Sequence, residues 1–379
     1  MNYQIQTLNA ISPAIYTQLG EHYHVSDSAG QPDAILVRSA SMHDMPLAPS
    51  VLSIARAGAG TNNIPIDACT QAGVCVFNTP GANANAVCEM VLAAMLLSCR
   101  DIVGGVEWAR GLKGQGDGIE KAVEKGKKAF VGPELRGKTL GVIGLGAIGV
   151  LVANAAAALG MKIVGYDPFL SVTHALNLTP GVEVVDTLPE LYAKADYISL
   201  HLPMNDATRG TLNEASFAAM KDGVRIVNLA RGELVDTPAL KAALDSGKCA
   251  AYVTDFPNSE TAAMEGVVAI PHLGASTPES EDNCAMMAAR EVKEYLDNGS
   301  IINSVNLPNL TMAWAAKTRV CVISKGADAA AIAGAVPAVA SASNTRGEYA
   351  YTILDTDAAV DEAAIAAIPG VLRVRVLTR

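Results

Sequence analysis

The sequence has few charged side chains, and positive ones are in the minority. Of its 379 residues, 17% are charged, and 28 Lys and Arg stand against 38 Asp and Glu, which gives a formal net charge of −10. An acidic chain of this kind is a poor candidate for binding the phosphate backbone of a nucleic acid. Half of the residues are hydrophobic, which is enough to bury a large core and excludes wholesale disorder.

The sequence also lacks the marks of secretion, membrane insertion and paired cysteines. Its first residues contain no basic segment leading into an apolar one, as a secretory signal would. Polar residues interrupt each apolar stretch before it reaches the roughly 20 residues that span a membrane. The seven cysteines are scattered, and no two are spaced as Cys-x-x-Cys, so we expect buried, reduced thiols in a cytoplasmic protein. We expect neither a membrane partner nor a metal site.

Three blocks of the sequence, distinguished by their patterns of predicted strands and helices, indicate the domain organisation. In the first two, Val- and Ile-rich runs alternate with turns or with Ala- and Leu-rich helices, which is typical of doubly wound parallel sheets. The third has the order of a ferredoxin-like βαββαβ unit. We therefore expect an α/β protein with two doubly wound parallel-sheet domains and a small βαββαβ domain. The substrate-binding domain would comprise residues 1–95 and 280–310, the nucleotide-binding Rossmann domain 96–279, and the small domain 318–379.

The elements expected within these domains are short. The Gly- and Lys-rich residues 111–136 predict an exposed connection with a short helix. A helix is predicted at 85–99 from its apolar face. Strands are predicted at 34–37, 51–55, 74–77, 140–143, 162–166, 197–200, 224–229, 251–255 and 267–270.

A glycine-rich motif follows one of these strands. Gly144-Leu145-Gly146-Ala147-Ile148-Gly149 comes directly after 140–143 and opens a predicted helix. In a dinucleotide-binding turn the first glycine makes the bend, the second lets a pyrophosphate approach, and the third lets helix and strand pack. Asp167 ends the next strand, where it can accept hydrogen bonds from ribose hydroxyls and would repel a 2′-phosphate, so NAD is favoured over NADP. The alternative, a glycine turn without a nucleotide, is disfavoured by this context.

Two of the six histidines are well placed for catalysis. His201 and His272 each follow a predicted strand at its carboxyl end, which is where ligands bind in open α/β sheets. The other four lie in polar or turn-like surroundings, and we expect them to be exposed to solvent.

Three further segments carry a resemblance to a known family. Residues 227–236 read Val-Asn-Leu-Ala-Arg-Gly-Glu-Leu-Val-Asp, residues 255–260 read Asp-Phe-Pro-Asn-Ser-Glu, and residues 271–277 read Pro-His-Leu-Gly-Ala-Ser-Thr. They resemble the arginine signature, the glutamate segment and the histidine signature of the D-isomer-specific 2-hydroxyacid dehydrogenases. With the glycine motif, they occur in the family's order, and the resemblance covers about residues 1–310.

The resemblance implies NAD-dependent oxidation of a 2-hydroxy acid, with roles for three catalytic residues. His272 would take the hydroxyl proton, because imidazole titrates near neutrality. Arg231 would hold the carboxylate with its planar fork of donors. Glu260 would favour the imidazolium of His272 and fix its tautomer, although its segment is equally typical of an exposed loop. His201 is assigned to packing. The cofactor would be bordered by Leu202, Pro203, Leu229, Ala230, Asp255 and Gly274, besides Gly144, Gly146, Ala147, Ile148, Gly149, Asp167, Arg231 and His272.

Within the family, the chain resembles members that oxidise 3-phospho-D-glycerate to 3-phosphohydroxypyruvate, the first step of serine biosynthesis. Residues 37–39 resemble a phosphate-side segment, residues 56–63 resemble the substrate loop, and the third block resembles an ACT domain, a regulatory or oligomerisation module. We therefore expect a small, phosphorylated 2-hydroxy acid as substrate. Its binding residues would be Arg38, Arg56, Ala57, Gly58, Ala59, Arg231 and His272.

Departures from the family pattern leave alternatives open. Ala40 stands where some members have a second arginine, so phosphate binding would depend strongly on Arg56. Residues 324–327 lack the His and Asn of serine-inhibited members, which puts serine feedback in doubt. The substrate could be another D-2-hydroxy acid such as glycerate or lactate, or the protein could be a non-catalytic sensor of NAD. The resemblance implies a homodimer or homotetramer. The lysines at 121, 125, 127 and 128 either form a solvated helix face or serve a partner subunit's site.

Overall fold

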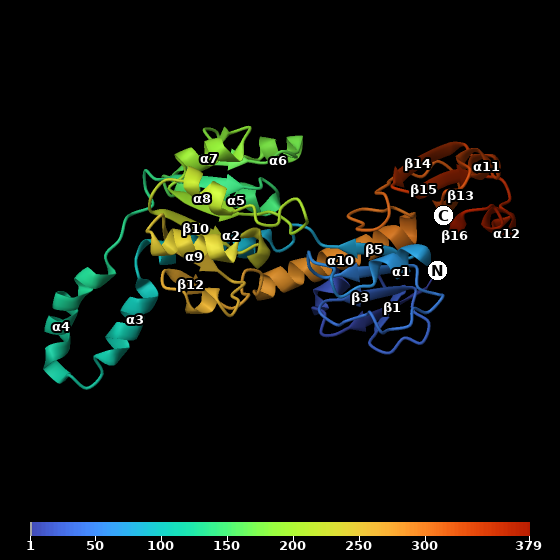
Figure 1. Ribbon diagram of the computed structural model, residues 1–379. Coiled ribbons are helices and arrows are strands. Elements are labelled where there is room, and N and C mark those ends of the chain that lie inside the picture. The colour runs from blue at the N-terminus through green and yellow to red at the C-terminus, as the bar shows by residue number, and fades with distance from the viewer. Residues whose placement is uncertain (1) are drawn as a thin grey trace. The chain divides into compact units, whose positions relative to one another are not determined.

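The computed structural model describes residues 2–379 and forms two compact units. The first unit runs to Asn83 and resumes at Pro278, and the second spans Ala84–Thr277 (Figure 1). Each unit is built around its own parallel sheet, and the first unit also contains an antiparallel sheet. Within residues 2–379, no helix combines the length and the apolar composition that crossing a lipid bilayer requires. All seven cysteines are free and buried, as predicted.

The parallel sheet of the first unit has five strands in the order β2-β1-β3-β4-β5. Its elements are β1 Tyr3–Leu8, η1 Pro13–Thr17, β2 Tyr23–Ser26, β3 Ala34–Val37, β4 Ser53–Arg56, α1 Ile66–Gln71, β5 Cys75–Asn78 and the long helix α10 Pro278–Asn298. Strands β1 and β2 were not predicted from the sequence. Polar residues such as Gln4 and His24 are exposed on these strands, so their apolar residues alternate with polar ones and form no continuous run.

The second unit is a seven-stranded parallel sheet in the order β12-β11-β10-β9-β6-β7-β8. Its elements are α2 Ala84–Cys99, α3 Ile102–Gly111, η2 Gly116–Gly118, α4 Ile119–Gly126, η3 Lys127–Phe130, β6 Thr139–Ile143, α5 Ala147–Ala158, β7 Lys162–Tyr166, α6 Val172–Leu176, β8 Glu183–Val184, α7 Leu188–Lys194, β9 Tyr197–Leu200, α8 Glu214–Ala219, β10 Val224–Asn228, η4 Gly232–Leu234, α9 Thr237–Asp245, β11 Cys249–Thr254, η5 Thr261–Ala263 and β12 Val267–Ala269. The chain leaves β6 in one direction through β7 and β8 and in the other through β9 to β12. This is the doubly wound order of a Rossmann domain, as predicted.

The division between the units differs from the expected boundary at residue 95. Helix α2 belongs to the second unit, because its buried face joins the core beneath that sheet. Val91 and Met95 are fully buried there in one cluster with Leu140 and Val142 of β6. The antiparallel sheet, which was expected as a separate domain, is grouped with the first unit.

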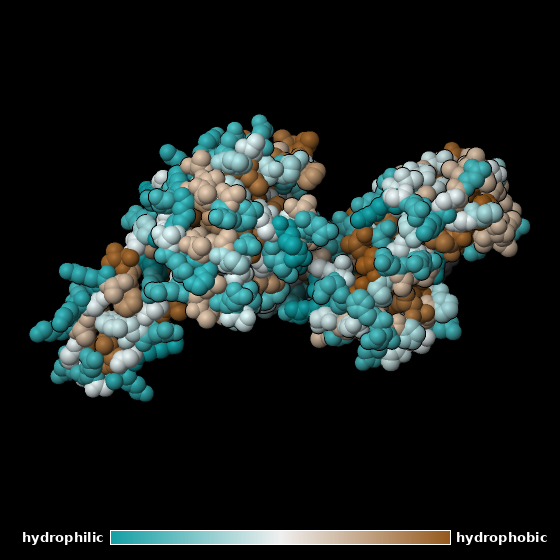
Figure 2. Space-filling model, in the orientation of Figure 1, coloured by the Kyte–Doolittle hydropathy of each residue, from teal (hydrophilic) through white to brown (hydrophobic). Residues whose placement is uncertain are grey.

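Residues 102–130 form a helical arm, where the sequence analysis expected an exposed connection from residue 111 onward. Helices α3 and α4 run side by side and extend away from the sheet of the second unit (Figure 1). Trp108 of α3 packs against Phe130 of η3, the short helix that follows α4, with ring centroids 5.5 Å apart. Gly126 makes this possible, because a Cβ there would lie 2.3 Å from the Trp108 ring. The arm also exposes apolar side chains (Figure 2), among them Ile102, Val103, Val106 and Val123.

The third block confirms the predicted βαββαβ order. It consists of β13 Thr318–Lys325, α11 Ala329–Gly334, β14 Ala340–Arg346, β15 Tyr349–Thr356, α12 Glu362–Ala366 and β16 Val371–Thr378. All strand pairs are antiparallel, in the order β14-β15-β13-β16. The two strands that are central in the sheet, β13 and β15, are the most buried. The resemblance to an ACT domain stays a prediction.

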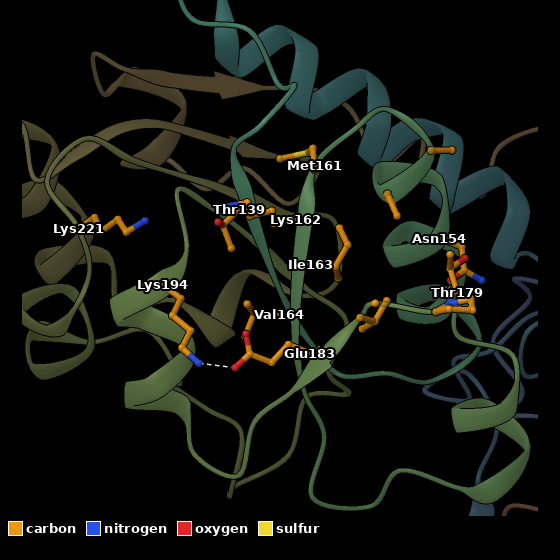
Figure 3. Close-up of a pocket in the computed structure, with 15 residues that line it drawn as sticks. Thr139, Asn154, Met161, Lys162, Ile163, Val164, Thr179, Glu183, Lys194 and Lys221 are labelled. Carbon is orange, nitrogen blue, oxygen red and sulfur yellow. Dashed lines mark hydrogen bonds and ion pairs between the residues drawn. The ribbon is translucent and has the colours of Figure 1, made fainter.

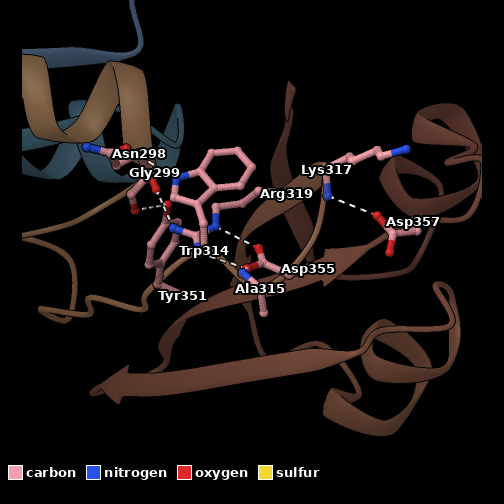
Figure 4. Close-up of polar contacts among 9 residues, drawn as sticks. All are labelled: Asn298, Gly299, Trp314, Ala315, Lys317, Arg319, Tyr351, Asp355 and Asp357. Carbon is pink, nitrogen blue, oxygen red and sulfur yellow. Dashed lines mark hydrogen bonds and ion pairs between the residues drawn. The ribbon is translucent and has the colours of Figure 1, made fainter. Parts of the chain in front are cut away.

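This block is attached to the carboxyl end of α10. Arg375 donates hydrogen bonds to the carbonyl oxygens of Tyr295 and Leu296, each at 3.0 Å. Arg319 donates to the carbonyl of Asn298 at 2.8 Å and forms a fully buried ion pair with Asp355 (Figure 4). The last carbonyls of a helix have no partner within the helix, so side chains of the third block satisfy them here.

The middle of α10 carries a buried acid. The side chain of Glu291 is 3% exposed. Its Oε1 accepts a hydrogen bond from Asn303 Nδ2 at 2.6 Å, whereas its buried Oε2 has no hydrogen-bond partner among residues 2–379. Burial raises the pKa of Glu291 to about 8, so the folded protein holds this carboxyl protonated at neutral pH.

We predict that Glu291 makes the protein less stable as the pH rises from about 4.5 to about 8. In this window the unfolded chain has released the Glu291 proton and the folded protein still holds it, so each step up in pH favours unfolding. Glu291→Gln keeps the acceptor for Asn303 and removes the proton equilibrium. Its melting temperature, measured by calorimetry, should exceed that of the wild type more at pH 8 than at pH 5. An equal difference at both pH values would contradict the prediction.

Candidate functional site

The glycine motif forms a tight turn between β6 and α5. Gly144 has a φ of +94°, and a Cβ there would lie 2.6 Å from the carbonyl oxygen of His201. A Cβ on Gly149 would lie 1.9 Å from the carbonyl oxygen of Gly144. Gly146 is different, because it precedes the first residue of α5 and a Cβ there would meet nothing within 4 Å. The turn therefore leaves open space at the amino end of a twelve-residue helix, where an anion is favoured.

Asp167 closes this turn from the neighbouring strand. One of its carboxylate oxygens accepts a hydrogen bond from the backbone N–H of Leu145, and the other accepts from that of Phe169, both at 2.8 Å. The carboxylate is thereby fixed beside the glycine turn at the end of β7, and it is only partly buried. Each oxygen retains acceptor capacity for a ribose hydroxyl.

His201 lies behind the turn in a packed position. Its backbone N–H donates to the carbonyl of Ile143, and its Nε2 lies 2.9 Å from the hydroxyl of Ser199. Burial lowers the pKa of His201 to about 4, so the ring is neutral at physiological pH. These contacts agree with the assignment of His201 to packing.

Asp255 is a deeply buried candidate residue, with 1% of its surface exposed. Burial raises its pKa, while the N–H of Gly274 opposes the shift by donating to Oδ2 at 3.3 Å. Its Oδ1 is buried and has no hydrogen-bond partner among the described residues. An acceptor left in this condition is costly without a ligand or water, and a nicotinamide carboxamide or a ribose hydroxyl could supply the missing donor.

Arg231 and His272 meet at a ring that the sequence analysis did not single out. The guanidinium carbon of Arg231 lies 5.3 Å from the centroid of the Phe256 ring, and the His272 ring lies 4.4 Å from it, centroid to centroid. Arg231 Nη1 also donates to the carbonyl of Ala230 at 2.6 Å. Both side chains act on the carboxylate of Asp255, where their charges oppose the rise in pKa that burial causes. The structure therefore brings the expected cation and the expected base together at the carboxyl ends of β10 and β12, the two strands on either side of β11. In the sequence, the only signal for a role of Phe256 in the site is its position next to Asp255.

Glu260 does not bond to His272 in this structure. It lies in a turn in which Asn258 Oδ1 accepts from the N–H groups of Glu260 and Thr261, at 2.9 and 2.8 Å. The side chains of Glu260 and His272 are both exposed, and no hydrogen bond or ion pair joins them within residues 2–379. The orienting role of Glu260 stays a prediction.

The substrate residues expected in the first unit lie together at the carboxyl edge of its sheet. Arg38 follows β3 and Arg56 ends β4, and Arg56 Nε donates to the carbonyl of Arg38 at 3.1 Å. The Arg56 guanidinium lies over Gly58, where a Cβ would be 2.2 Å from Nη1. Ala57 is buried, and the carbonyl of Ala59 accepts a hydrogen bond from Asn78 at 2.6 Å. Their roles stay predictions.

The second unit has a cavity at the amino ends of two of its strands. It is lined by Thr139 and Lys162, which begin β6 and β7, and by Lys194 and Glu183, which form an ion pair (Figure 3). The glycine turn follows the opposite, carboxyl end of β6. The cavity is therefore not the expected cofactor site.

The comparison with known families addresses the nucleotide-binding unit directly. Residues 92–274 match the family described as D-isomer specific 2-hydroxyacid dehydrogenase, NAD binding domain. This part of the chain belongs to that family. The match includes the glycine turn, Asp167, Arg231, Asp255 and His272.

The similar proteins include several D-3-phosphoglycerate dehydrogenases and a D-mandelate dehydrogenase. The D-3-phosphoglycerate dehydrogenase of Archaeoglobus fulgidus is 38% identical over 291 residues, which are 73% of this chain and 52% of that protein. The chain thus spans about half the length of the curated relatives it matches. The NAD+-bound 3-phosphoglycerate dehydrogenase of Entamoeba histolytica has a TM-score of 0.63 at 27% identity, covering 82% of this chain and 100% of that one. The apo D-mandelate dehydrogenase of Rhodotorula graminis has a TM-score of 0.69 at 26% identity, covering 83% and 99%.

The residues of this dehydrogenase domain fit NAD, the cofactor in the family's description. Gly146 leaves space for a pyrophosphate at the helix terminus, and Asp167 presents acceptors for the adenosine ribose. The unpartnered Oδ1 of Asp255 suits the nicotinamide half. No group of three or more His, Cys, Asp or Glu capable of holding a metal ion occurs in the described part of the chain.

We predict that Gly146→Val weakens cofactor binding without unfolding the protein. Gly146 has an extended backbone, and nothing lies within 4 Å of a Cβ there, so the fold has room for a β-carbon at this position, and the larger valine side chain would occupy the space for the pyrophosphate. Calorimetry should show NAD binding weakened about tenfold or more, with an unchanged melting temperature. The matched variant Gly149→Ala should instead lower the melting temperature, because its Cβ would collide with the carbonyl of Gly144. Normal NAD affinity in Gly146→Val would contradict this interpretation of the turn.

Proposed function

We propose that the protein oxidises 3-phospho-D-glycerate with NAD to give 3-phosphohydroxypyruvate, the first step of serine biosynthesis. The observation that carries this proposal is the placement of Arg231 and His272 against the Phe256 ring, at the strand ends of an NAD-binding domain. The relatives named D-3-phosphoglycerate dehydrogenase support this choice of substrate.

We assign each part of the proposed reaction to one or two side chains. Bound NAD would accept a hydride from C2 of the substrate. Arg231 would hold the substrate carboxylate through its paired donors, and an imidazole nitrogen of His272 would take the C2 hydroxyl proton. Glu260 would stabilise the imidazolium once it forms. Arg38 and Arg56 would supply the positive charge for the phosphate.

A second candidate keeps the chemistry and changes the substrate. The similarity to D-mandelate dehydrogenase favours another D-2-hydroxy acid. A panel of 2-oxo acids at fixed NADH would separate the two, with 3-phosphohydroxypyruvate, hydroxypyruvate, pyruvate and phenylglyoxylate as substrates. We predict the highest kcat/KM for 3-phosphohydroxypyruvate. Turnover of the others without it would shift the assignment to an unphosphorylated acid, and no turnover at all would favour a non-catalytic sensor of NAD.

We predict that His272→Ala lowers kcat by about 10²- to 10⁴-fold, because the hydroxyl proton then lacks its acceptor. The affinity for NAD, measured by calorimetry, should change little, since the glycine turn and Asp167 are untouched. The control His24→Ala removes an exposed imidazole on β2 and should leave kcat as it is. Near-normal turnover of His272→Ala would remove this residue from the role of base.

We further propose that the protein acts in the cytoplasm as a homodimer or homotetramer. Seven free thiols suit a reducing compartment. The apolar side chains exposed on α3 and α4, such as Val103 at 43% and Val106 at 44%, offer a surface for a second copy. The exposed Lys121, Lys125 and Lys128 of the same arm would then be candidates to serve a partner's site. The third block would build the oligomer or bind an effector.

A further inference from the structure

One of the two arginines proposed to bind phosphate is already held by a carboxylate. Arg38 Nη2 donates to Glu281 Oε1 at 2.7 Å, and the two side chains are 41% and 43% exposed. Glu281 belongs to the first turn of α10, and it belongs to the same unit as Arg38. The ion pair therefore lies within one unit, at the sheet edge that also carries Arg56.

The second arginine is tied to the first through the backbone. Strands β3 and β4 pair in register, with Val37 opposite Arg56, and Arg56 Nε donates to the carbonyl of Arg38. Two guanidinium groups thus belong to neighbouring strand ends. Glu281 neutralises the charge of Arg38, which is one of the two positive charges proposed to meet a phosphate dianion.

We propose that Glu281 competes with the phosphate of the substrate for Arg38 and so sets how strongly the protein prefers phosphorylated substrates; this rests on the proposed function. A guanidinium offers its paired donors to a carboxylate or to a phosphate. A phosphate that binds Arg38 must displace the Glu281 carboxylate or lie beside it, and like charges at that distance repel each other. Glu281 acts against phosphate binding and leaves the reacting end of the substrate unaffected.

Glu281→Gln distinguishes the effect of the negative charge from that of the hydrogen bond with Arg38. The amide oxygen still accepts a hydrogen bond from Arg38, whereas the negative charge is gone. The KM for 3-phosphohydroxypyruvate should fall about threefold to tenfold, a modest change because exposed charges are screened by solvent and salt. The kcat and the KM for unphosphorylated hydroxypyruvate should stay as in the wild type. The gain should shrink when ionic strength rises from about 0.02 M to about 0.5 M.

Glu279→Gln is the matched control. Glu279 is exposed in the same helical turn, and no hydrogen bond or ion pair joins it to Arg38 in the described part of the chain. If removing any negative charge from this turn lowered the KM, the two variants would behave alike. The proposal requires that Glu281→Gln has the larger effect by a clear margin. Equal effects, an unchanged KM or a higher KM for the phosphorylated substrate would overturn it, the last by showing that Glu281 positions Arg38 for the phosphate.

Calorimetry with inorganic phosphate distinguishes a failure of this inference from a failure of the proposed function. Glu281→Gln should bind phosphate more tightly than the wild type. In a protein that already carries Arg38→Ala, adding Glu281→Gln should leave the phosphate affinity unchanged. The guanidinium for which Glu281 and the phosphate compete is absent from this protein. This holds whether or not the enzyme turns over the phosphorylated substrate. Absence of turnover with tighter phosphate binding by Glu281→Gln would reject the substrate alone. Turnover without any gain in phosphate affinity would reject the role of Glu281 alone.

Discussion

The site depends on the parallel register of four strands in the second unit. Ile143 of β6 pairs with Leu200 of β9, Leu200 pairs with Asn228 of β10, and Asn228 pairs with Thr254 of β11. Because these strands end level with one another, the residues that follow them emerge in one row at the carboxyl edge. The row contains Gly144, His201, Leu229 and Asp255. A slip of one residue in any pairing would turn a site side chain to the other face of the sheet.

Desolvation divides the candidate site residues of the second unit into two kinds of group. His201 and Asp255 are held away from water, which keeps His201 neutral and leaves Asp255 with one unpartnered oxygen. Arg231 and His272 remain exposed around Phe256. Groups that bind and pack are thus shielded from water, whereas the groups that would have to reach a substrate and exchange a proton with it are exposed. This division suits a domain that holds a cofactor on one side and meets a second reactant on the other.

Helix α10 connects several features of the first unit that lie far apart in the sequence. Its first turn provides Glu281 for Arg38, its middle holds the buried Glu291, and its last carbonyls bind Arg375 and Arg319 of the third block. A ligand or partner that shifted the third block would therefore act on the same helix that contacts the proposed phosphate site. The buried ion pair between Arg319 and Asp355 fixes the geometry of this attachment, since either charge would be left uncompensated if the other were lost.

The sequence was sufficient to specify the doubly wound second domain, the βαββαβ block and the glycine turn, and it singled out Asp167, Arg231, Asp255 and His272, whose roles stay predictions. Each of these depends on local signals: an apolar run, a glycine at a turn, or a motif that follows a strand. It was not sufficient for β1, whose alternating pattern becomes a central strand only through its neighbours, or for the arm, which is stabilised by Trp108 against Phe130. The contact of Phe256 with both catalytic candidates, the Arg38–Glu281 pair and the separation of Glu260 from His272 depend on side chains from segments distant in the chain. Such contacts are determined by how strands and helices pack in three dimensions, and the spacing of residues along the chain does not predict them.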